Sequence, residues 1–171
     1  IKNSKTTKNP TYHEESIDYI RIVDKKKSTK SHIVIKNDVT EITKEVFRNN
    51  DSITSIIIPN SVVKISDGAF WSCKSLTDIV IPDSVTSIGS HAFWGCYSLK
   101  NIQLSNSITE IKDAAFRYCS SLNDVVIPNS VTKIGKFAFE ECISLNNIVI
   151  PETTIVDETA FVGCKNLKKT K

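Results

Sequence analysis

Short stretches of alternating apolar and polar residues recur along this chain, and most of them lead into a proline-containing turn. The stretch 76–98, LTDIVIPDSVTSIGSHAFWGCYS, shows the full pattern. Its first apolar residues alternate as in a short strand, and Ala92, Phe93 and Cys96 have the spacing of one face of a short helical turn. Eight positions are therefore predicted to point inward: Leu76, Ile79, Ile81, Val85, Ile88, Ala92, Phe93 and Cys96.

The same pattern returns every 23 residues. Four columns of identical residues keep this step: Pro59, Pro82, Pro128 and Pro151; Phe47, Phe70, Phe93, Phe116 and Phe139; Cys73, Cys96, Cys119 and Cys142; Leu76, Leu99, Leu122 and Leu145. Ser105 fills the missing proline position, and the last unit has lost one residue between Pro151 and Phe161. A single unit has no second layer against which to bury its apolar side chains. The units are therefore predicted to stack, with each strand pairing with the next.

One unit also fits the leucine-rich repeat frame L-x-x-L-x-L-x-x-N/C, because Leu76, Ile79, Ile81 and Ser84 take this spacing, with serine in the last slot. The longer phrase IPxSVTxIGxxAFxxCxSL resembles the BspA-like class of leucine-rich repeats, and the resemblance covers residues 33 to 167. It implies an α/β fold, a curved right-handed solenoid with a parallel sheet on its concave side and short helical turns opposite. It also implies frequent occurrence on bacterial and protist cell surfaces.

Three regions are predicted along the chain. Residues 1–16 are polar, and we expect a flexible N-terminal segment. Residues 17–32 are expected to form an N-terminal cap strand, at 17–23, and a basic loop, since terminal repeats need caps. Residues 33–171 are expected to form the solenoid of about six units, with Lys36 in place of proline and Asn50 in place of cysteine in the first. No comparable cap is predicted after Leu167.

Composition and charge narrow the functional classes. Apolar runs do not exceed three residues, as at 56–58, whereas a membrane helix needs about 20, so no membrane insertion is predicted for this segment. Residues 1–36 carry nine Lys/Arg against four Asp/Glu, and the rest of the chain thirteen against fifteen. Because this basic excess is terminal, a solvated loop is favoured over a nucleic-acid or acidic-lipid site. The chain opens on Ile1 and contains no methionine, so we expect a processed form or a fragment.

Neither a cofactor nor a metal site is predicted. The cysteines come once per unit and not in C-x2-C pairs, and His13, His32 and His91 are scattered. An inward cysteine column packs as small hydrophobic side chains, so buried free thiols are expected, with a disulfide or a metal as less favoured alternatives. The serine columns recur in near-identical copies without histidine, and paired carboxylates at a fixed distance and a Gly-rich phosphate loop are missing from the sequence. These features predict that the protein is not an enzyme.

The outward positions of the strands provide the first candidate binding site, on the predicted concave face. One outward column is mostly aliphatic: Val34, Ile57, Val80, Gln103, Val126 and Val149. A polar column flanks it: Ser55, Asp78, Asn101, Asp124 and Asn147. An exposed apolar stripe can mark a binding surface. The β-propensity of valine and isoleucine explains the stripe equally well, and contact with a neighbouring chain is a third explanation.

Aromatic residues provide a second candidate site. Trp71 and Trp94 follow two of the column phenylalanines, Arg117 takes the same position in the next unit, and Tyr97 and Tyr118 lie close by. An arginine beside two indoles suggests a cation–π ladder, and these residue types dominate interface hot spots. The alternative is that the indoles lie flat over the turns and cover the core.

The sequence thus predicts a non-enzymatic module that binds a host or extracellular protein, as a cell-surface or secreted adhesin-type protein. The alternative is an intracellular leucine-rich-repeat scaffold, since free cysteines are typical of a reducing compartment. A glycosylation sequon at Asn50 falls in a turn and is predicted to be reachable. The sequence does not predict the oligomeric state.

Overall fold

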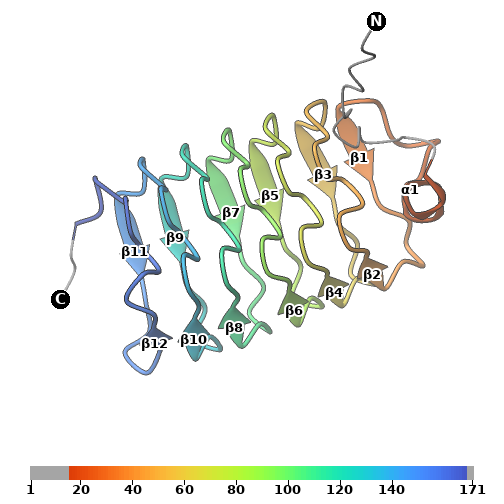
Figure 1. The fold of residues 1–171 in the computed structure, drawn as a ribbon. Helices are drawn as coiled ribbons and strands as arrows, with labels where there is room; N and C mark the ends of the chain where they lie inside the picture. Colours follow the sequence, from red (N-terminus) through yellow and green to blue (C-terminus); the bar gives the residue numbers. More distant parts are fainter. Residues whose placement is uncertain (1–15, 169–171) are drawn as a thin grey trace, which may run out of the picture.

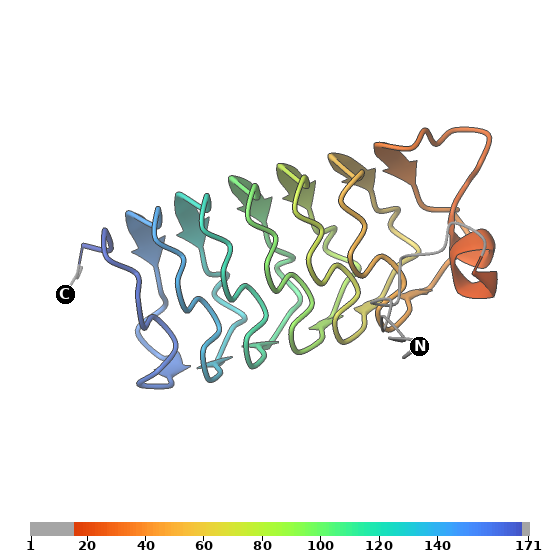
Figure 2. The same cartoon turned by 45° about the horizontal axis from the view of Figure 1, so that its top comes forward.

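The computed structural model describes residues 16–168, and the units form a single row (Figures 1 and 2). Along one side of the row lie strands of three residues each: β1 (His32–Val34), β3 (Ser55–Ile57), β5 (Asp78–Val80), β7 (Asn101–Gln103), β9 (Asp124–Val126) and β11 (Asn147–Val149). They pair in this order in one six-stranded parallel sheet. The partner of Asp124 is Asn147 in the next unit, which confirms the repeat of 23 residues. The concave position of this sheet and the hand of the row stay predictions.

Strands of two residues lie along the other side of the row: β2 (Glu41–Ile42), β4 (Lys64–Ile65), β6 (Ser87–Ile88), β8 (Glu110–Ile111), β10 (Lys133–Ile134) and β12 (Ile155–Val156). They form two three-stranded parallel sheets, β2-β4-β6 and β8-β10-β12. Lys133 of β10 pairs with Ile155 of β12, a step of one residue less than the partners in the longer sheet. The residue missing from the last unit therefore lies between β11 and β12.

The turns that were predicted to be helical are not helical. In the unit that contains β6, the N–H groups of His91, Phe93 and Gly95 donate to carbonyl groups of the following unit, whereas those of Ala92 and Trp94 donate three residues back. His91 and Gly95 also have left-handed backbone angles, with φ of 58° and 71°. A helix needs successive N–H groups to bond within its own segment. Because alternate groups here bond to the next unit, the segment forms a chain of turns.

The N-terminal end of the row is closed by a helix, so the prediction of a strand over 17–23 is wrong. Helix α1 (Ile17–Ile22) begins after Ser16, whose hydroxyl accepts a hydrogen bond of 3.2 Å from the Tyr19 N–H. Its buried residues, Tyr19 and Ile22, are three positions apart, which is the spacing of one helix face. Only Val23 makes an isolated antiparallel bridge, to Ile35. The predicted flexible segment, apart from Ser16, lies outside the described residues.

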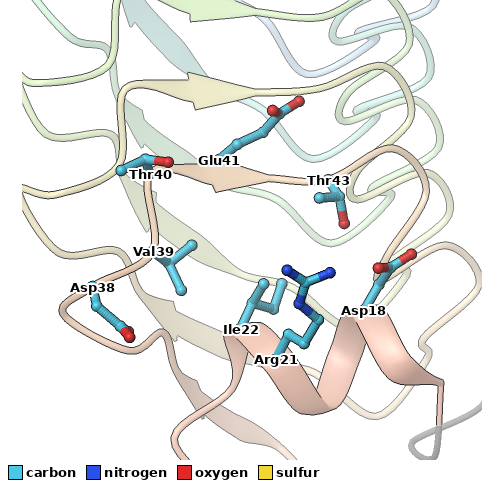
Figure 3. Close-up of a pocket in the computed structure, with 8 residues that line it drawn as sticks. All are labelled: Asp18, Arg21, Ile22, Asp38, Val39, Thr40, Glu41 and Thr43. Atoms are coloured by element: carbon cyan, nitrogen blue, oxygen red, sulfur yellow. The ribbon is translucent and has the colours of Figure 1, made fainter.

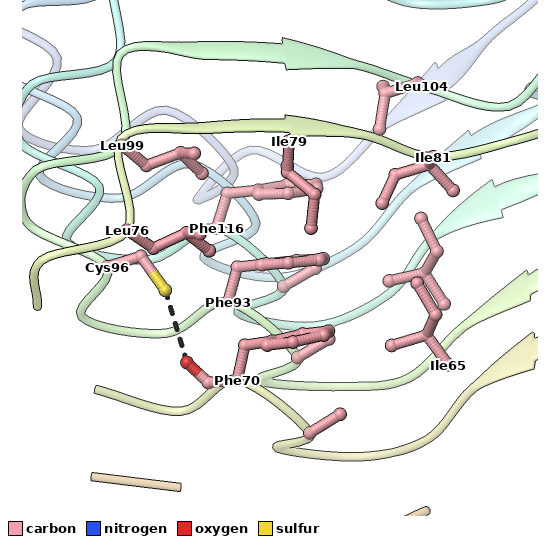
Figure 4. Packing of buried hydrophobic residues seen from close by; sticks show 14 of the residues in the cluster. Ile65, Phe70, Leu76, Ile79, Ile81, Phe93, Cys96, Leu99, Leu104 and Phe116 are labelled. Carbon is pink, nitrogen blue, oxygen red and sulfur yellow. Dashed lines mark hydrogen bonds between the residues drawn. The ribbon is translucent and has the colours of Figure 1, made fainter. Parts of the chain in front are cut away.

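The inward columns form one continuous core, as predicted (Figure 4). All eight inward positions predicted between 76 and 96 are at most 3% exposed. The column phenylalanines stack ring on ring, with centroids 5.1 to 5.3 Å apart, from Phe47 to Phe161. Tyr19 of α1 closes the N-terminal end of this stack, edge-on to Phe47 at 5.7 Å. The stack links every unit to the next, so the row behaves as one core extended in one dimension.

Candidate binding surface

The six-stranded sheet exposes a row of aliphatic side chains on its outer face. In each strand the middle residue points into the core, so that its neighbours point outward. Ile57, Val80, Val126 and Val149 are between 51% and 67% exposed and are named here the aliphatic ridge. Gln103 is exposed between them, and Val34 at the N-terminal end is partly buried. Five of the six residues of the outward column are thus exposed on this face, and their role as a binding site stays a prediction.

The polar column beside the ridge is ordered by hydrogen bonds between adjacent strands. The amide of Asn101 donates to the carboxylate of Asp78 at 2.6 Å, and that of Asn147 donates to Asp124 at 2.7 Å. The first of these bonds, together with one from Thr77, lowers the pKa of Asp78. No ion pair within residues 16–168 involves either carboxylate. The column therefore presents two fixed negative charges whose outer sides face solvent.

The indole of Trp71 is already in contact with neighbouring side chains on both sides. The guanidinium of Arg48, in the preceding unit, lies 4.3 Å from its ring centroid. The ring of His91, in the following unit, stacks on it at 5.5 Å and Trp94 lies tilted at 5.0 Å. The cation on the indoles is thus Arg48, and not Arg117 as the spacing suggested. These contacts favour the interpretation that the indoles cover the core.

Arg117 makes its own set of contacts further along the row. Its guanidinium lies 4.9 Å from the Tyr118 ring and 5.3 Å from the Phe137 ring. It also pairs with the carboxylate of Glu140, in the next unit, at 2.5 Å. Tyr118 meets Trp94 edge-on at 5.4 Å, so the two aromatic groups join. Tyr97, the remaining candidate of this set, is exposed and outside the stack.

Two hollows lie outside the six-stranded sheet, among the two-residue strands and the turns that follow them, here called the turn side of the row. One, of about 310 Å³, lies between α1 and the first unit, where Asp18 and Arg21 face Glu41 and Thr43 (Figure 3). The other, of about 290 Å³, lies beside Trp71 and is lined by Asp67 and His91 among others. Neither brings together a set of metal ligands: among residues 16–168 no group of three or more His, Cys, Asp or Glu side chains could hold a metal ion.

The cysteine thiols are free, and four of the five are fully buried, as predicted. Each thiol donates to a phenylalanine carbonyl of the unit before it, as Cys96 does to Phe70 at 3.2 Å (Figure 4). Burial raises the pKa of every thiol, that of Cys96 to about 12 and that of the half-buried Cys164 to about 11. A high pKa keeps the thiols protonated, so these cysteines act as core residues.

The sequon at Asn50 is not reachable, which corrects the prediction. Asn50 takes the position of the missing cysteine in the first unit and is 3% exposed. Its side-chain oxygen accepts from the Ser52 N–H at 3.1 Å. A side chain that points inward and holds its own turn cannot accept a glycan without local opening.

The described residues contain no helix long and apolar enough to span a bilayer. Residues 40–168 match six copies of the family described as the BspA type leucine rich repeat region. No curated protein matches the chain significantly.

Several solved structures of bacterial proteins resemble this one. A leucine-rich repeat protein from Eubacterium ventriosum is 22% identical, with a TM-score of 0.70 over 84% of this chain and 44% of its own. The T. pallidum leucine-rich repeat protein is 33% identical, with a TM-score of 0.63 over 81% of this chain and 57% of its own. The pneumococcal vaccine antigen PcpA is 29% identical, with a TM-score of 0.63 over 72% of this chain and 31% of its own. The chain thus spans between 31% and 57% of the length of these three proteins. The family match covers most of the chain, and the chain therefore belongs to the BspA-type leucine-rich repeat family.

Proposed function

We propose that this chain is a non-enzymatic protein-binding module of a cell-surface or secreted adhesin-type protein. The ligand is a host or extracellular protein, and it binds across the aliphatic ridge and the polar column on the predicted concave face. The observation that carries the proposal is the exposure of the ridge, more than half of each side chain in four strands of one sheet. Burial of such surface by a ligand contributes about 25 cal/mol per Å².

The arrangement suits recognition by many small contacts. Adjacent strands lie about 4.8 Å apart, so the ridge offers apolar contacts from four of the six strands, interrupted by Gln103, over a hydrogen-bonded sheet. Asp78 and Asp124 flank it, and neither carboxylate forms a salt bridge among the described residues. A ligand that places apolar side chains on the ridge and a donor or cation at the carboxylates satisfies both columns.

A surface location is supported by similarity to PcpA, a protein named as a pneumococcal vaccine antigen. The competing proposal is an intracellular scaffold, and the five free thiols favour it. Both proposals use the same surface. They differ in the compartment and in the identity of the ligand.

Charge substitutions on the ridge test the surface. Val80→Glu combined with Val126→Glu should abolish binding to immobilised extracellular proteins or to host cells. The melting temperature should change little because both side chains point outward. Val63→Glu is the matched control, since Val63 is exposed elsewhere on the row. Persistent binding by the ridge variant, or equal loss in the control, would refute the assignment.

Two further measurements separate the alternatives. Removal of residues 1–16 should leave binding intact, and binding should weaken only slightly with salt, because the basic N-terminal region is not the site proposed here. If Trp71→Ala and Trp94→Ala abolish binding while the ridge variant does not, the ligand binds the aromatic edge. A scaffold role would instead be indicated by cytoplasmic partners that bind through the ridge.

A further inference from the structure

The basic loop between α1 and β1 is held in place by hydrogen bonds. This loop, residues 24–31, lies together with α1 at the N-terminal end of the row (Figures 1 and 2). The N–H groups of Lys27 and Ser28 donate to the Asp24 carbonyl at 3.1 and 3.0 Å. The Ser28 hydroxyl accepts from the N–H of Val34 in β1 at 2.9 Å and donates to its carbonyl at 3.4 Å. The loop therefore presents its lysine side chains from a fixed backbone.

The positive charge of this end is not neutralised by its own acidic residues. Residues 16–36 carry six Lys/Arg against two Asp/Glu, whereas residues 37–168 carry eleven against fifteen. The carboxylate of Asp24 is already engaged, because it accepts from the Lys26 N–H at 3.1 Å and pairs with Lys27 at 3.6 Å. Three lysines are exposed and form no salt bridge within the described part of the chain: Lys25, Lys26 and Lys30.

A hollow of about 260 Å³ lies between the loop and the end of α1. Its lining combines two lysines and two hydroxyl residues with an apolar side: Lys25, Lys30, Ser28, Thr29, Tyr19 and Val23. The Thr29 hydroxyl accepts from the His32 N–H at 3.1 Å and keeps its own hydrogen to donate. Two ammonium groups and a hydroxyl donor around one hollow suit an oxyanion such as a phosphate group.

The outer face of α1 is apolar, in contrast with the loop beside it. Tyr19 and Ile22 are buried against the core, whereas Ile17 and Ile20, also three positions apart, are 76% and 42% exposed. Aliphatic side chains beside unpaired lysines are the combination that binds the surface of an anionic bilayer, because the apolar groups enter the headgroup boundary and the lysines attract the lipid charge. A nucleic acid or an acidic polysaccharide would neutralise the lysines and leave the isoleucines in water. Charge alone favoured a solvated loop, and the exposed isoleucines are what the structure adds.

We propose that the outer face of α1 and the basic loop form a docking surface for an anionic lipid bilayer. Ile17 and Ile20 enter the headgroup boundary, and the phosphate of one lipid occupies the hollow between Lys25 and Lys30. The row then stands on the bilayer by its N-terminal end, and the face of the six-stranded sheet stays accessible along its side (Figure 1). This proposal does not depend on the aliphatic ridge.

Vesicle co-sedimentation of the full chain tests the charge part of the proposal. The probes are phosphatidylcholine vesicles with and without phosphatidylserine, and binding at low salt is expected only where phosphatidylserine is present. Each lysine near an anionic surface adds about fivefold to the partition coefficient, so the triple variant Lys25→Gln, Lys26→Gln and Lys30→Gln should bind about a hundredfold more weakly. The matched control removes three exposed lysines that form no salt bridge elsewhere on the row and should keep most of the binding: Lys133→Gln, Lys136→Gln and Lys165→Gln.

Isoleucine substitutions separate a bilayer from other polyanions. Ile17→Ser combined with Ile20→Ser should weaken binding to the phosphatidylserine vesicles about tenfold or more, since binding strength follows the buried apolar area. The matched control is Ile143→Ser combined with Ile155→Ser, because these side chains are 41% and 74% exposed on other units. It should bind as the unmodified chain does. The melting temperature of each variant verifies that the fold is intact.

Three outcomes would overturn the proposal. The first is no binding to the phosphatidylserine vesicles, and the second is equal binding to vesicles of phosphatidylcholine alone. The third is binding that needs the lysines but not the isoleucines and that heparin reproduces, because the ligand would then be a soluble polyanion. Val80→Glu combined with Val126→Glu should bind the vesicles unchanged, so that a failure of the ridge and a failure of this surface are told apart.

Discussion

Truncation of one ring in the phenylalanine stack gives the sharpest test of the architecture. Phe116 is 1% exposed and lies between Phe93 and Phe139, each with its ring centroid 5.3 Å away. Phe→Ala in a core costs about 3–5 kcal/mol, and each ring pair accounts for about 0.5–1.5 kcal/mol of such a loss. Because Phe116→Ala removes two pairs at a site packed on both sides, we expect a loss near the upper end, about 4–5 kcal/mol.

Phe161→Ala is the internal comparison. Among residues 16–168, Phe161 stacks only on Phe139, at 5.3 Å, and it is partly exposed. One ring pair and part of the burial are lost, so we expect about half the cost, roughly 2 kcal/mol. Urea unfolding followed by circular dichroism measures the loss of stability in both variants. The slope of the unfolding free energy against urea concentration should be the same in both, which verifies that the same part of the molecule unfolds. A loss at Phe161 equal to or greater than that at Phe116, at equal slopes, would refute one-sided stacking at the C-terminal end.

Three other outcomes follow from particular contacts. A thiol reagent at pH 8 should label the half-buried Cys164 first and the four buried cysteines slowly, because burial raises the pKa of all five thiols. Mass spectrometry should count five labels only after denaturation. Gly89→Ala should cost about 1–3 kcal/mol in urea unfolding, since an added Cβ would lie 2.5 Å from the carboxylate of Asp67; an unchanged midpoint would contradict this close approach. Asn101→Ala should destabilise the protein at pH 7 by removing its bond to Asp78, whose pKa is lowered in the folded state. That difference should be full above about pH 4 and shrink as the pH falls through the folded pKa; a difference that grows in acid would be the contrary result.

The six-stranded sheet could be predicted because the sequence repeats in two ways, every two residues along each strand and every 23 residues from unit to unit. Alternation along each strand fixes which residues point inward, and the 23-residue step fixes the register, as in the pairing of Ile33 with Ile56. The two-residue strands were not predicted, since two residues contain no alternation to detect. Helix α1 was misassigned because a strand was assumed for the cap, although Tyr19 and Ile22 have the spacing of one helix face. The turns were misassigned for another reason. Spacings of three and four residues do not reveal whether each N–H bonds within its segment or to the next unit.

Some residues depend on a partner in the adjacent unit, and comparing the same position across all units does not reveal such pairs. Asp67 accepts from the Ser90 N–H at 2.9 Å, and its carboxylate lies over Gly89. Asp113 repeats this arrangement over Gly135, two units further along the row: it accepts from the Lys136 N–H at 2.9 Å. Where the preceding unit has no aspartate, the position of the glycine is taken by another residue: Ser66, Lys112 or Asp157. These two glycines are thus explained by the close approach of the backbone and the aspartate side chain of the previous unit, and only a comparison of neighbouring units shows it.

The two sides of the row differ in whether their side chains are already used. On the turn side, Trp71 is covered by Arg48 and His91, and Arg117 is paired with Glu140, so the conspicuous residues stabilise the stacking of units. On the sheet side, backbone hydrogen bonds and the side chains of the polar column join the strands, and the ridge residues contribute little to that pairing. A ligand can therefore bind the ridge without breaking contacts between units, whereas binding at the indoles would have to displace them. For this reason we propose the sheet face, and not the aromatic edge, as the ligand-binding surface.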